Sequence, residues 1–489
     1  MTDTKQTANE ARRFTMDMLW VAASQLLIQA LGVITLPALT KTYSSELYGV
    51  WTQTSVTVGL LVPIITLHLS TAAVRFLSAE DDVNVRRRQF GAMLWPILVL
   101  GLIVLSVSLS FGEKLSLFIF SSNQYQKFIP LAFTWVCTGA LFNFGIAYLR
   151  ARGKIRRLAL INISFSITKM LLIVILATQG FGLEWIMGSI IVVEGLLVLL
   201  VFGLIISEIG IPWPNTTGIK RFLAFSIPQI PSGILLWVIS ASDRYFITHL
   251  LDLSQAGIYS ASYSLGSLIS IFFSPISFVL LPSLSRFWEN RQITRVKNYL
   301  EYSNKLFLAL AIPGAAGLFV LSQPLLKLLT RPEYAVGGEL VLLIALGVLL
   351  LGLYQINLYI MYLLEQTKWL PLMILAAAGV NAGINIVLIP QVGIIGAAVS
   401  TIVAYLVLAA IVTIWARKAI SYKLDVLFIG KVILATGVMS LCLWFIPVEG
   451  VVSIGLAVVA GLVVYGASLV LLKTFSGRDT LVIKEIVRR

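Results

Sequence analysis

Two charged residues lie deep inside long apolar segments of this sequence. Lys169 lies nine residues before position 178, where its segment ends, and Glu194 lies nine residues after position 185, where the next begins. Charges within apolar spans are costly in hydrocarbon and mark functional candidates. Because consecutive spans are antiparallel, we expect both residues at similar depth. We predict a functional cation with an acidic partner, or a proton site; an ion pair that only locks the hairpin is the open alternative.

Three further charges lie in or beside apolar segments. Asp243 and Arg244 are neighbours within one segment, and Arg75 ends an earlier one. Adjacent helical residues point about 100° apart, so Asp243 and Arg244 cannot both face one partner squarely. We therefore expect the two side chains to have different partners. For Arg75, extension of the side chain to the membrane surface is the alternative to binding an anion.

The composition indicates the elements that must position these charges. Of 489 residues, 58% are hydrophobic and only 12% are charged, whereas soluble domains average about 25% charged. About 20 apolar residues span a bilayer as a helix. The sequence therefore predicts an all-α polytopic membrane protein with about fourteen spans: 16–38, 49–73, 89–111, 128–149, 158–178, 185–207, 223–248, 256–282, 304–323, 339–364, 369–390, 394–416, 426–447 and 451–472.

Positive charges cluster between the apolar segments. The net charge is +14, and Lys and Arg gather at 86–88, 150–157 and 286–305. Cytoplasmic loops of membrane proteins collect such residues, so we expect both termini in the cytoplasm. This distribution accounts for the charge and excludes nucleic acid as the partner.

Residues for metal, cofactor or nucleotide chemistry are few. Cys137 and Cys442 lie in separate apolar segments, and the only histidines are His68 and His249. No phosphate-binding Gly-x-x-x-x-Gly-Lys-Ser/Thr loop occurs, so no ATPase is built in. We expect no metal and no cofactor, and a transporter rather than an enzyme.

The chain also repeats itself. Gly49-Val50-Trp51 matches Gly257-Ile258-Tyr259 at an offset of 208 residues; further matches are Tyr125 with Tyr334, and Gln179 with Gln391. Six helices per repeat make the two halves parallel. We predict an N-lobe over 1–212, a C-lobe over 213–420, and two further helices with a cytoplasmic tail over 421–489. Such repeats suit alternating access, in which one half moves against the other around a fixed site.

Several motifs resemble those of bacterial O-antigen and capsular polysaccharide flippases, in the multidrug/oligosaccharidyl-lipid/polysaccharide exporter superfamily. They are Leu69 to Phe76, Tyr148 to Ala151, Ser242 to Tyr245, Ala256 to Ser260, Val380 to Asn385, Leu388 to Pro390 and Gly393 to Ala398. The resemblance implies a protein of the bacterial inner membrane that flips a polyprenyl-pyrophosphate-linked oligosaccharide to the outer leaflet by alternating access. It also implies membrane lipids as partners, and polysaccharide polymerase or chain-length machinery as candidate partners.

The resemblance adds meaning to the candidate residues. Asp243 and Arg244 would line a cavity between the lobes, one touching substrate and the other anchoring a neighbouring helix, and we favour Arg244 for substrate. Arg75 would meet the entering pyrophosphate, and Lys169 would bind phosphate with Glu194 as its acidic partner. These five residues form the predicted substrate-binding set. A multidrug or toxin extruder of the same superfamily is the alternative; it would need coupling carboxylates, and Glu194 is the only clear one within a span. A non-transporting scaffold is the more distant alternative.

Overall fold

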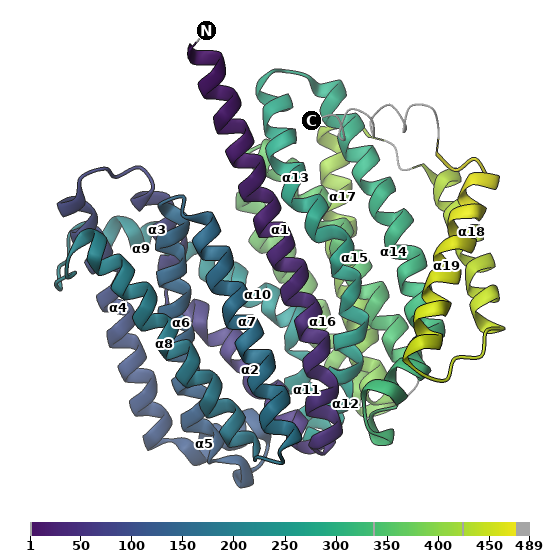
Figure 1. Ribbon diagram of the computed structural model, residues 1–489, viewed down its shortest axis with the longest axis horizontal. Coiled ribbons are helices and arrows are strands. Elements are labelled where there is room, and N and C mark those ends of the chain that lie inside the picture. The colour runs from purple at the N-terminus through teal and green to yellow at the C-terminus, as the bar shows by residue number, and fades with distance from the viewer. Residues whose placement is uncertain (1, 336–337, 423–424, 476–489) are drawn as a thin grey trace. The chain divides into compact units, whose positions relative to one another are not determined.

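The computed structural model describes residues 2–335, 338–422 and 425–475, and no β-strand occurs among them. Figure 1 shows the helices. They are α1 (Thr2–Thr42), α2 (Ser45–Ile65), α3 (Leu69–Leu77), α4 (Val83–Ser110), α5 (Gly112–Phe120), α6 (Phe128–Ala151), α7 (Ile155–Thr178), α8 (Leu183–Ile209), α9 (Ile219–Ser226), α10 (Ile230–Ala241), α11 (Asp243–Leu250), α12 (Leu253–Gly266), α13 (Ser270–Glu289), α14 (Ile293–Leu329), α15 (Gly338–Leu363), α16 (Leu370–Val392), α17 (Ile394–Ala419), α18 (Val426–Trp444) and α19 (Val451–Leu471).

The described residues contain 14 helical segments long and apolar enough to cross a membrane, so the predicted number of spans is confirmed. Several boundaries differ from the prediction. The ninth span was predicted over 304–323, but its helix runs over the 37 residues Ile293–Leu329. Apolar patterning marks the part that crosses hydrocarbon, whereas backbone hydrogen bonds allow the helix to continue beyond it.

The second span is not the continuous helix predicted over 49–73. It is interrupted between α2 and α3, where Leu67 and His68 have φ values of 48° and 52°. Two consecutive non-glycine residues in the left-handed region are uncommon and carry strain. Pro63 lies just before the break, and its carbonyl accepts a hydrogen bond from the His68 amide at 3.1 Å.

The seventh span was also predicted as one continuous helix, over 223–248, and it is broken too. It consists of α9, a short 3-10 helix at Ile227–Gln229, then α10 and α11. Pro228 lies in the 3-10 helix, and proline lacks the backbone N–H that an uninterrupted α-helix uses.

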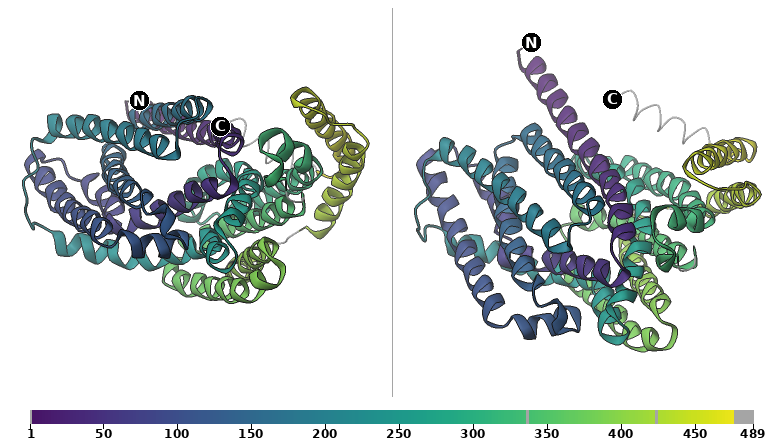
Figure 2. Two further views of the ribbon diagram at one scale, coloured as in Figure 1. Left: turned by 90° about the horizontal axis from the view of Figure 1, so that it is seen from below. Right: turned by 60° about the horizontal axis from the view of Figure 1, so that its bottom comes forward.

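The chain forms two compact units. Of the described residues, unit 1 comprises those within 1–237 and 244–257, and unit 2 comprises those within 238–243 and 258–475. Within unit 1, α6 packs against α2, α3, α4 and α8. Figure 2 shows the helices of the N-terminal part, in purple to blue, from two further sides. Its aromatic residues anchor the core: the Phe90 ring of α4 lies 5.0 Å from that of Phe144 and 5.3 Å from that of Tyr148. This packing fixes α6 as the central helix of unit 1.

The first repeat motif marks a close helix contact within unit 1. A Cβ atom at Gly49 would collide with the carbonyl of Leu253, and one at Gly257 would collide with the carbonyl of Ser45. Beside them, the Ser45 and Ser254 hydroxyl oxygens lie 2.6 Å apart. Two glycines at equivalent places in the repeat therefore allow the starts of α2 and α12 to meet backbone to backbone.

Unit 2 is built around α14, α15, α16 and α17. Asn381 and Asn385 of α16 join α17 through buried hydrogen bonds to Ser400: the Ser400 hydroxyl lies 2.5 Å from Asn385 Oδ1, and Asn381 Nδ2 donates to Ser400 Oγ at 3.4 Å. The final helices α18 and α19 pack on α14, where the Tyr465 hydroxyl donates to the carbonyl of Ala309 at 2.6 Å. The paired asparagines thus hold helices together.

Candidate functional site

Lys169 of α7 lies over two indole rings in unit 1. Its Nζ is 5.0 Å from the centre of the Trp135 ring and 5.8 Å from that of Trp51. The ring centres are themselves 5.6 Å apart. An ammonium group within about 6 Å of an aromatic face is attracted by the ring quadrupole. The two indoles therefore hold this partly exposed cation without occupying its N–H donors.

Glu194 of α8 is only 5% exposed. Its Oε2 lies 2.6 Å from the hydroxyl oxygen of Thr138, and that oxygen also lies 3.1 Å from the carbonyl of Trp135. One hydroxyl proton can serve only one of these acceptors at a time. When the Thr138 hydroxyl donates to the Trp135 carbonyl, a hydrogen bond between Thr138 and Glu194 requires a proton on the Glu194 carboxyl group. The arrangement can therefore accept and release a proton at the carboxyl group.

A single turn of α6 connects the two charges. Trp135 contacts Lys169, and Thr138, three residues later, contacts Glu194. Among the described residues, Lys169 forms no ion pair with a carboxylate. The structure therefore brings the two predicted residues to one turn of α6 but joins them through an indole and a hydroxyl.

Arg75 lies in an exposed cluster of arginines and aromatic rings. Its guanidinium carbon is 4.4 Å from the centre of the Phe225 ring and 5.5 Å from that of Phe76. Arg221 of α9 lies 4.6 Å from the centre of the same Phe76 ring. A stacked guanidinium keeps its N–H edge available for a phosphate, so this cluster can bind an anion.

Asp243 and Arg244 are both buried, and the division between the two units falls between them. Asp243 is the first residue of α11, and it accepts a short hydrogen bond from the hydroxyl of Tyr259 on α12. This contact links the carboxylate to the neighbouring helix. Tyr259 is the repeat equivalent of Trp51, so each repeat motif places an aromatic side chain against a buried or half-buried charge.

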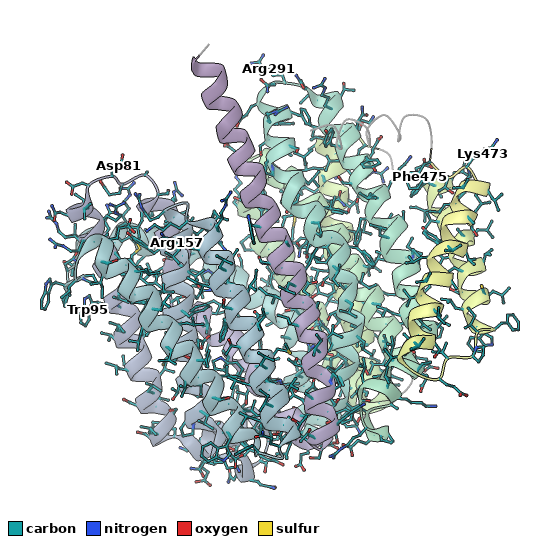
Figure 3. The ribbon with its side chains drawn as sticks, in the orientation of Figure 1. Asp81, Trp95, Arg157, Arg291, Lys473 and Phe475 are labelled. Carbon is teal, nitrogen blue, oxygen red and sulfur yellow. The ribbon has the colours of Figure 1, made fainter. Side chains whose placement is uncertain are left out.

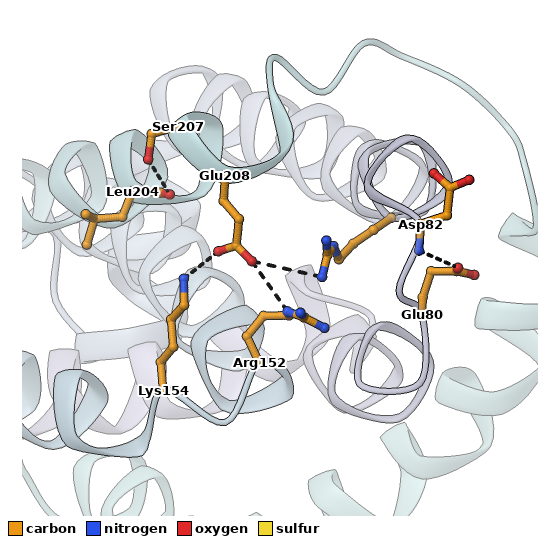
Figure 4. Close-up of polar contacts among 8 residues, drawn as sticks. Glu80, Asp82, Arg152, Lys154, Leu204, Ser207 and Glu208 are labelled. Carbon is orange, nitrogen blue, oxygen red and sulfur yellow. Dashed lines mark hydrogen bonds and ion pairs between the residues drawn. The ribbon is translucent and has the colours of Figure 1, made fainter.

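A second cluster of charges lies at the inner end of unit 1, the end that the predicted topology places in the cytoplasm. Glu208 of α8 receives Lys154 Nζ at 2.5 Å, Arg152 Nε at 3.4 Å and Arg86 Nη1 at 4.0 Å. Figure 4 shows Lys154 and Arg152 converging on Glu208. The three cations neutralise the Glu208 carboxylate and also interact favourably with the negative end of the α8 helix dipole. Their contacts join α4, α8 and the α6–α7 loop.

Metal coordination finds no support in the part of the chain that the structure describes. No group of three or more His, Cys, Asp or Glu side chains there is placed to hold a metal ion.

Comparison with protein families gives a match over residues 39–337, to the family described as "Polysaccharide biosynthesis protein". The match covers more than half of the chain. The chain belongs to this family.

Two curated relatives are similar to this protein over most of its length. A protein named "Probable low-salt glycan biosynthesis flippase Agl15", from Haloferax volcanii, is 20% identical over 76% of this chain and 78% of its own. A second, named "Probable lipid II flippase MurJ", from Bdellovibrio bacteriovorus, is 24% identical over 68% of each chain. The family resemblance derived from the motifs is therefore confirmed.

Solved structures show that the family member shares its fold with flippases and with multidrug transporters. A lipid II flippase MurJ in an inward closed conformation matches with a TM-score of 0.78 and 16% identity, over 92% of this chain and 97% of that one. An inward-facing multidrug resistance MATE family transporter of the MOP superfamily matches with a TM-score of 0.63 and 13% identity, over 83% and 94%. These matches confirm an all-helical, multi-pass membrane fold.

Sequence reasoning found the charges of this family member but missed the residues around them. Trp135, Thr138 and Arg221 were not predicted, and Glu208 was not singled out. A signal existed for one of the indoles, because Trp51 ends the first repeat motif. No local pattern marks Thr138 or Arg221, since their partners lie 56 and 145 residues away in the sequence.

Proposed function

We propose that this protein flips a polyprenyl-pyrophosphate-linked oligosaccharide from the cytoplasmic to the outer leaflet of the bacterial inner membrane. The observation that carries the proposal is membership of the polysaccharide biosynthesis family, together with curated relatives that bear flippase names. The product would serve assembly of a surface polysaccharide such as O-antigen or capsule. A polymerase with its chain-length machinery would consume it at the outer leaflet.

The proposed substrate combines groups that hydrocarbon does not tolerate with a tail that it does. A pyrophosphate is costly to bury without cations. Lys169 supports the proposal because its ammonium lies over indole faces with its donors still available. In this proposal Lys169 binds the pyrophosphate within the membrane. Glu194 balances the positive charge of Lys169 after the substrate has been released.

The remaining predicted residues take roles at other depths. Arg75, beside Arg221, would receive the pyrophosphate at the inner end. Arg244 would contact the substrate, while Asp243 anchors α11 to α12 through Tyr259. The N-lobe of 1–212 would move against the C-lobe of 213–420, so that the substrate site opens alternately to each side of the membrane. Both termini would lie in the cytoplasm. The broken second and seventh spans supply bending points for such a movement.

The membrane potential is sufficient to drive the step. Moving one charge outward is worth about 2.3 kcal/mol per 100 mV, so a pyrophosphate with roughly two negative charges gains about 5 kcal/mol at that potential. Potential-driven uniport is therefore feasible, and proton coupling through Glu194 is the alternative mechanism.

Deletion of the gene followed by complementation tests the proposal. Surface polysaccharide should be lost, and lipid-linked repeat units should accumulate facing the cytoplasm. The wild-type gene and a Lys114→Met variant should restore export, whereas Lys169→Met should not. Lys114 is the matched control because it is an exposed lysine that also stacks on an aromatic ring, Phe111, at 5.8 Å. Normal polysaccharide together with new sensitivity to cationic drugs would refute the flippase and favour the extruder.

A further inference from the structure

An apolar pocket opens on the side of unit 1, and none of the charged residues described above lines it. Its volume is about 600 Å³, and Leu67, Trp95, Val99, Pro214 and Ile219 are among the residues that line it. Pockets of about 300–1,000 Å³ are typical of small-molecule ligands. α4 forms one wall, and the 210–218 segment that leads into α9 forms the other.

The open side of this pocket faces hydrocarbon. Val99, in its wall, is 52% exposed, and Leu102 and Ile103 on the next turn of α4 are exposed as well. In a membrane-spanning helix, exposed aliphatic side chains face lipid. Figure 3 shows Trp95 at the flank of unit 1.

Two tryptophans set the depth of the pocket in the membrane. The Trp95 indole donates to the carbonyl of Pro212 at 3.2 Å, and Trp213 beside it is 71% exposed. Tryptophan prefers the level where lipid headgroups meet acyl chains. The pocket therefore lies where an acyl chain begins.

The inner rim of the pocket is positively charged. Asn215, which lines the pocket, donates from Nδ2 to the carbonyl of Arg88 at 2.8 Å, and Lys220 directly follows the lining residue Ile219. Both Arg88 and Lys220 are exposed. No Asp or Glu occurs in 83–101 or 209–221. Acids flank both stretches, and they already have contacts. Asp82, directly before the first stretch, accepts hydrogen bonds from the amides of Asn84 and Val85, and Glu80 accepts one from the Gln89 side chain at 3.5 Å. Glu208, directly before the second stretch, is paired with its three cations.

We propose that this pocket binds an acyl chain of an anionic membrane phospholipid whose phosphate lies against Arg88 and Lys220. An apolar pocket supplies the site for the chain, and basic residues at headgroup depth attract anionic lipid. The site is separate from Lys169 and Glu194 and does not rest on the flippase proposal, because lipid binding can be read without any transport measurement.

Native mass spectrometry of the purified full-length protein tests the proposal, with phosphatidylglycerol and phosphatidylcholine as probes. We expect the wild-type protein to retain phosphatidylglycerol in preference. The double variant Arg88→Gln with Lys220→Gln should weaken that binding by about tenfold or more, because two cations near the phosphate are removed. The matched control is Arg417→Gln with Lys418→Gln, two exposed basic residues at the end of α17, which should leave it unchanged.

A second pair of variants tests the pocket itself. Val99→Trp should fill the pocket and remove one bound phosphatidylglycerol, whereas Leu102→Trp, on the same exposed face but outside the pocket, should not. Equal lipid binding by these two variants would overturn the proposal. So would unchanged lipid preference in the Arg88/Lys220 variant, or displacement of phosphatidylglycerol from the pocket by an equimolar polyprenyl phosphate, which would assign the pocket to a substrate tail instead.

Discussion

Charged side chains have different partners in the middle of unit 1 and at its inner end. At the inner end, Glu208 contacts Lys154 and Arg152 directly, and Arg86 completes the cluster. In the middle of the spans, Lys169 and Glu194 have opposite charges but contact an indole pair and a hydroxyl.

The difference separates a structural use of charge from a functional one. Direct ion pairs neutralise the charges and tie helices together. A cation held over aromatic faces is stabilised without losing its N–H donors. We therefore expect the inner end to contribute to stability, and the middle of the spans to transport.

Replacement of Lys169 should have the largest effect. Lys169→Met keeps the length of the side chain but removes the cation, and a hydrogen bond to a charged group is worth about 1.5–3 kcal/mol, or roughly ten- to hundredfold in rate. We expect polysaccharide export to fall by that factor while the thermal stability of the purified protein changes little. Wild-type export by Lys169→Met would contradict the comparison.

Glu208→Gln should show the reverse pattern. It leaves three cations without their carboxylate, and the Arg86 side chain among them is only 4% exposed. Breaking a fully buried pair costs about 3–5 kcal/mol; because Glu208 is 23% exposed, we expect about 2 kcal/mol. The measurement is thermal unfolding in detergent, with Glu113→Gln, an exposed carboxylate beside Asn123, as the control. Lost export at unchanged stability would break the distinction.

Trp135→Phe should sharpen the account of the Lys169 site. Phenylalanine keeps an aromatic face but attracts a cation less strongly than tryptophan, and the whole cation–π attraction is worth about 0.5–2 kcal/mol. We expect export to fall about two- to fivefold. Trp135→Leu, which removes the aromatic face altogether, should lower export further; an equal effect of the two variants would show that packing alone matters.

The ion pair between Asp425 and Lys305 in unit 2 should contribute least, because the Asp425 side chain is 41% exposed. The Phe428 amide donates to Asp425 at 3.0 Å and Lys305 Nζ lies 3.0 Å from it, and these contacts hold the Asp425 pKa below its usual value. Because the folded-state pKa is lowered, the stabilisation is present above about pH 4 and is lost as pH falls through the lowered pKa.

Asp425→Asn tests this contribution. It keeps the helix cap of α18 but removes the charge, so we expect less than about 1 kcal/mol at neutral pH. The difference in unfolding temperature from the wild type should shrink between about pH 5 and pH 3. Asp425→Ala, which also removes the cap, should cost more at both pH values. A constant difference for Asp425→Asn would show that the charge does not contribute.

The sequence by itself determined that the protein is helical, that it has fourteen spans, and to which family it belongs. A helix needs about 20 apolar residues to cross the hydrocarbon core, and each span can be recognised from its own residues alone. Lys169 and Glu194 stood out for the same reason, because a charge within such a span is visible without any structure. Pro63 and Pro228 lie at the breaks in the second and seventh spans, but the left-handed backbone at Leu67 and His68 does not follow from the types of those two residues.

Only the tertiary structure decided what each charge contacts. Lys169 lies 34 residues from Trp135 and 118 from Trp51 in the sequence, and Glu194 lies 56 from Thr138. Such contacts depend on how helices pack and which faces they turn toward one another, and no periodicity within a single helix encodes its partners. The cost of placing one charged residue in hydrocarbon can be estimated from its own segment, whereas the contacts that form a site depend on several helices at once.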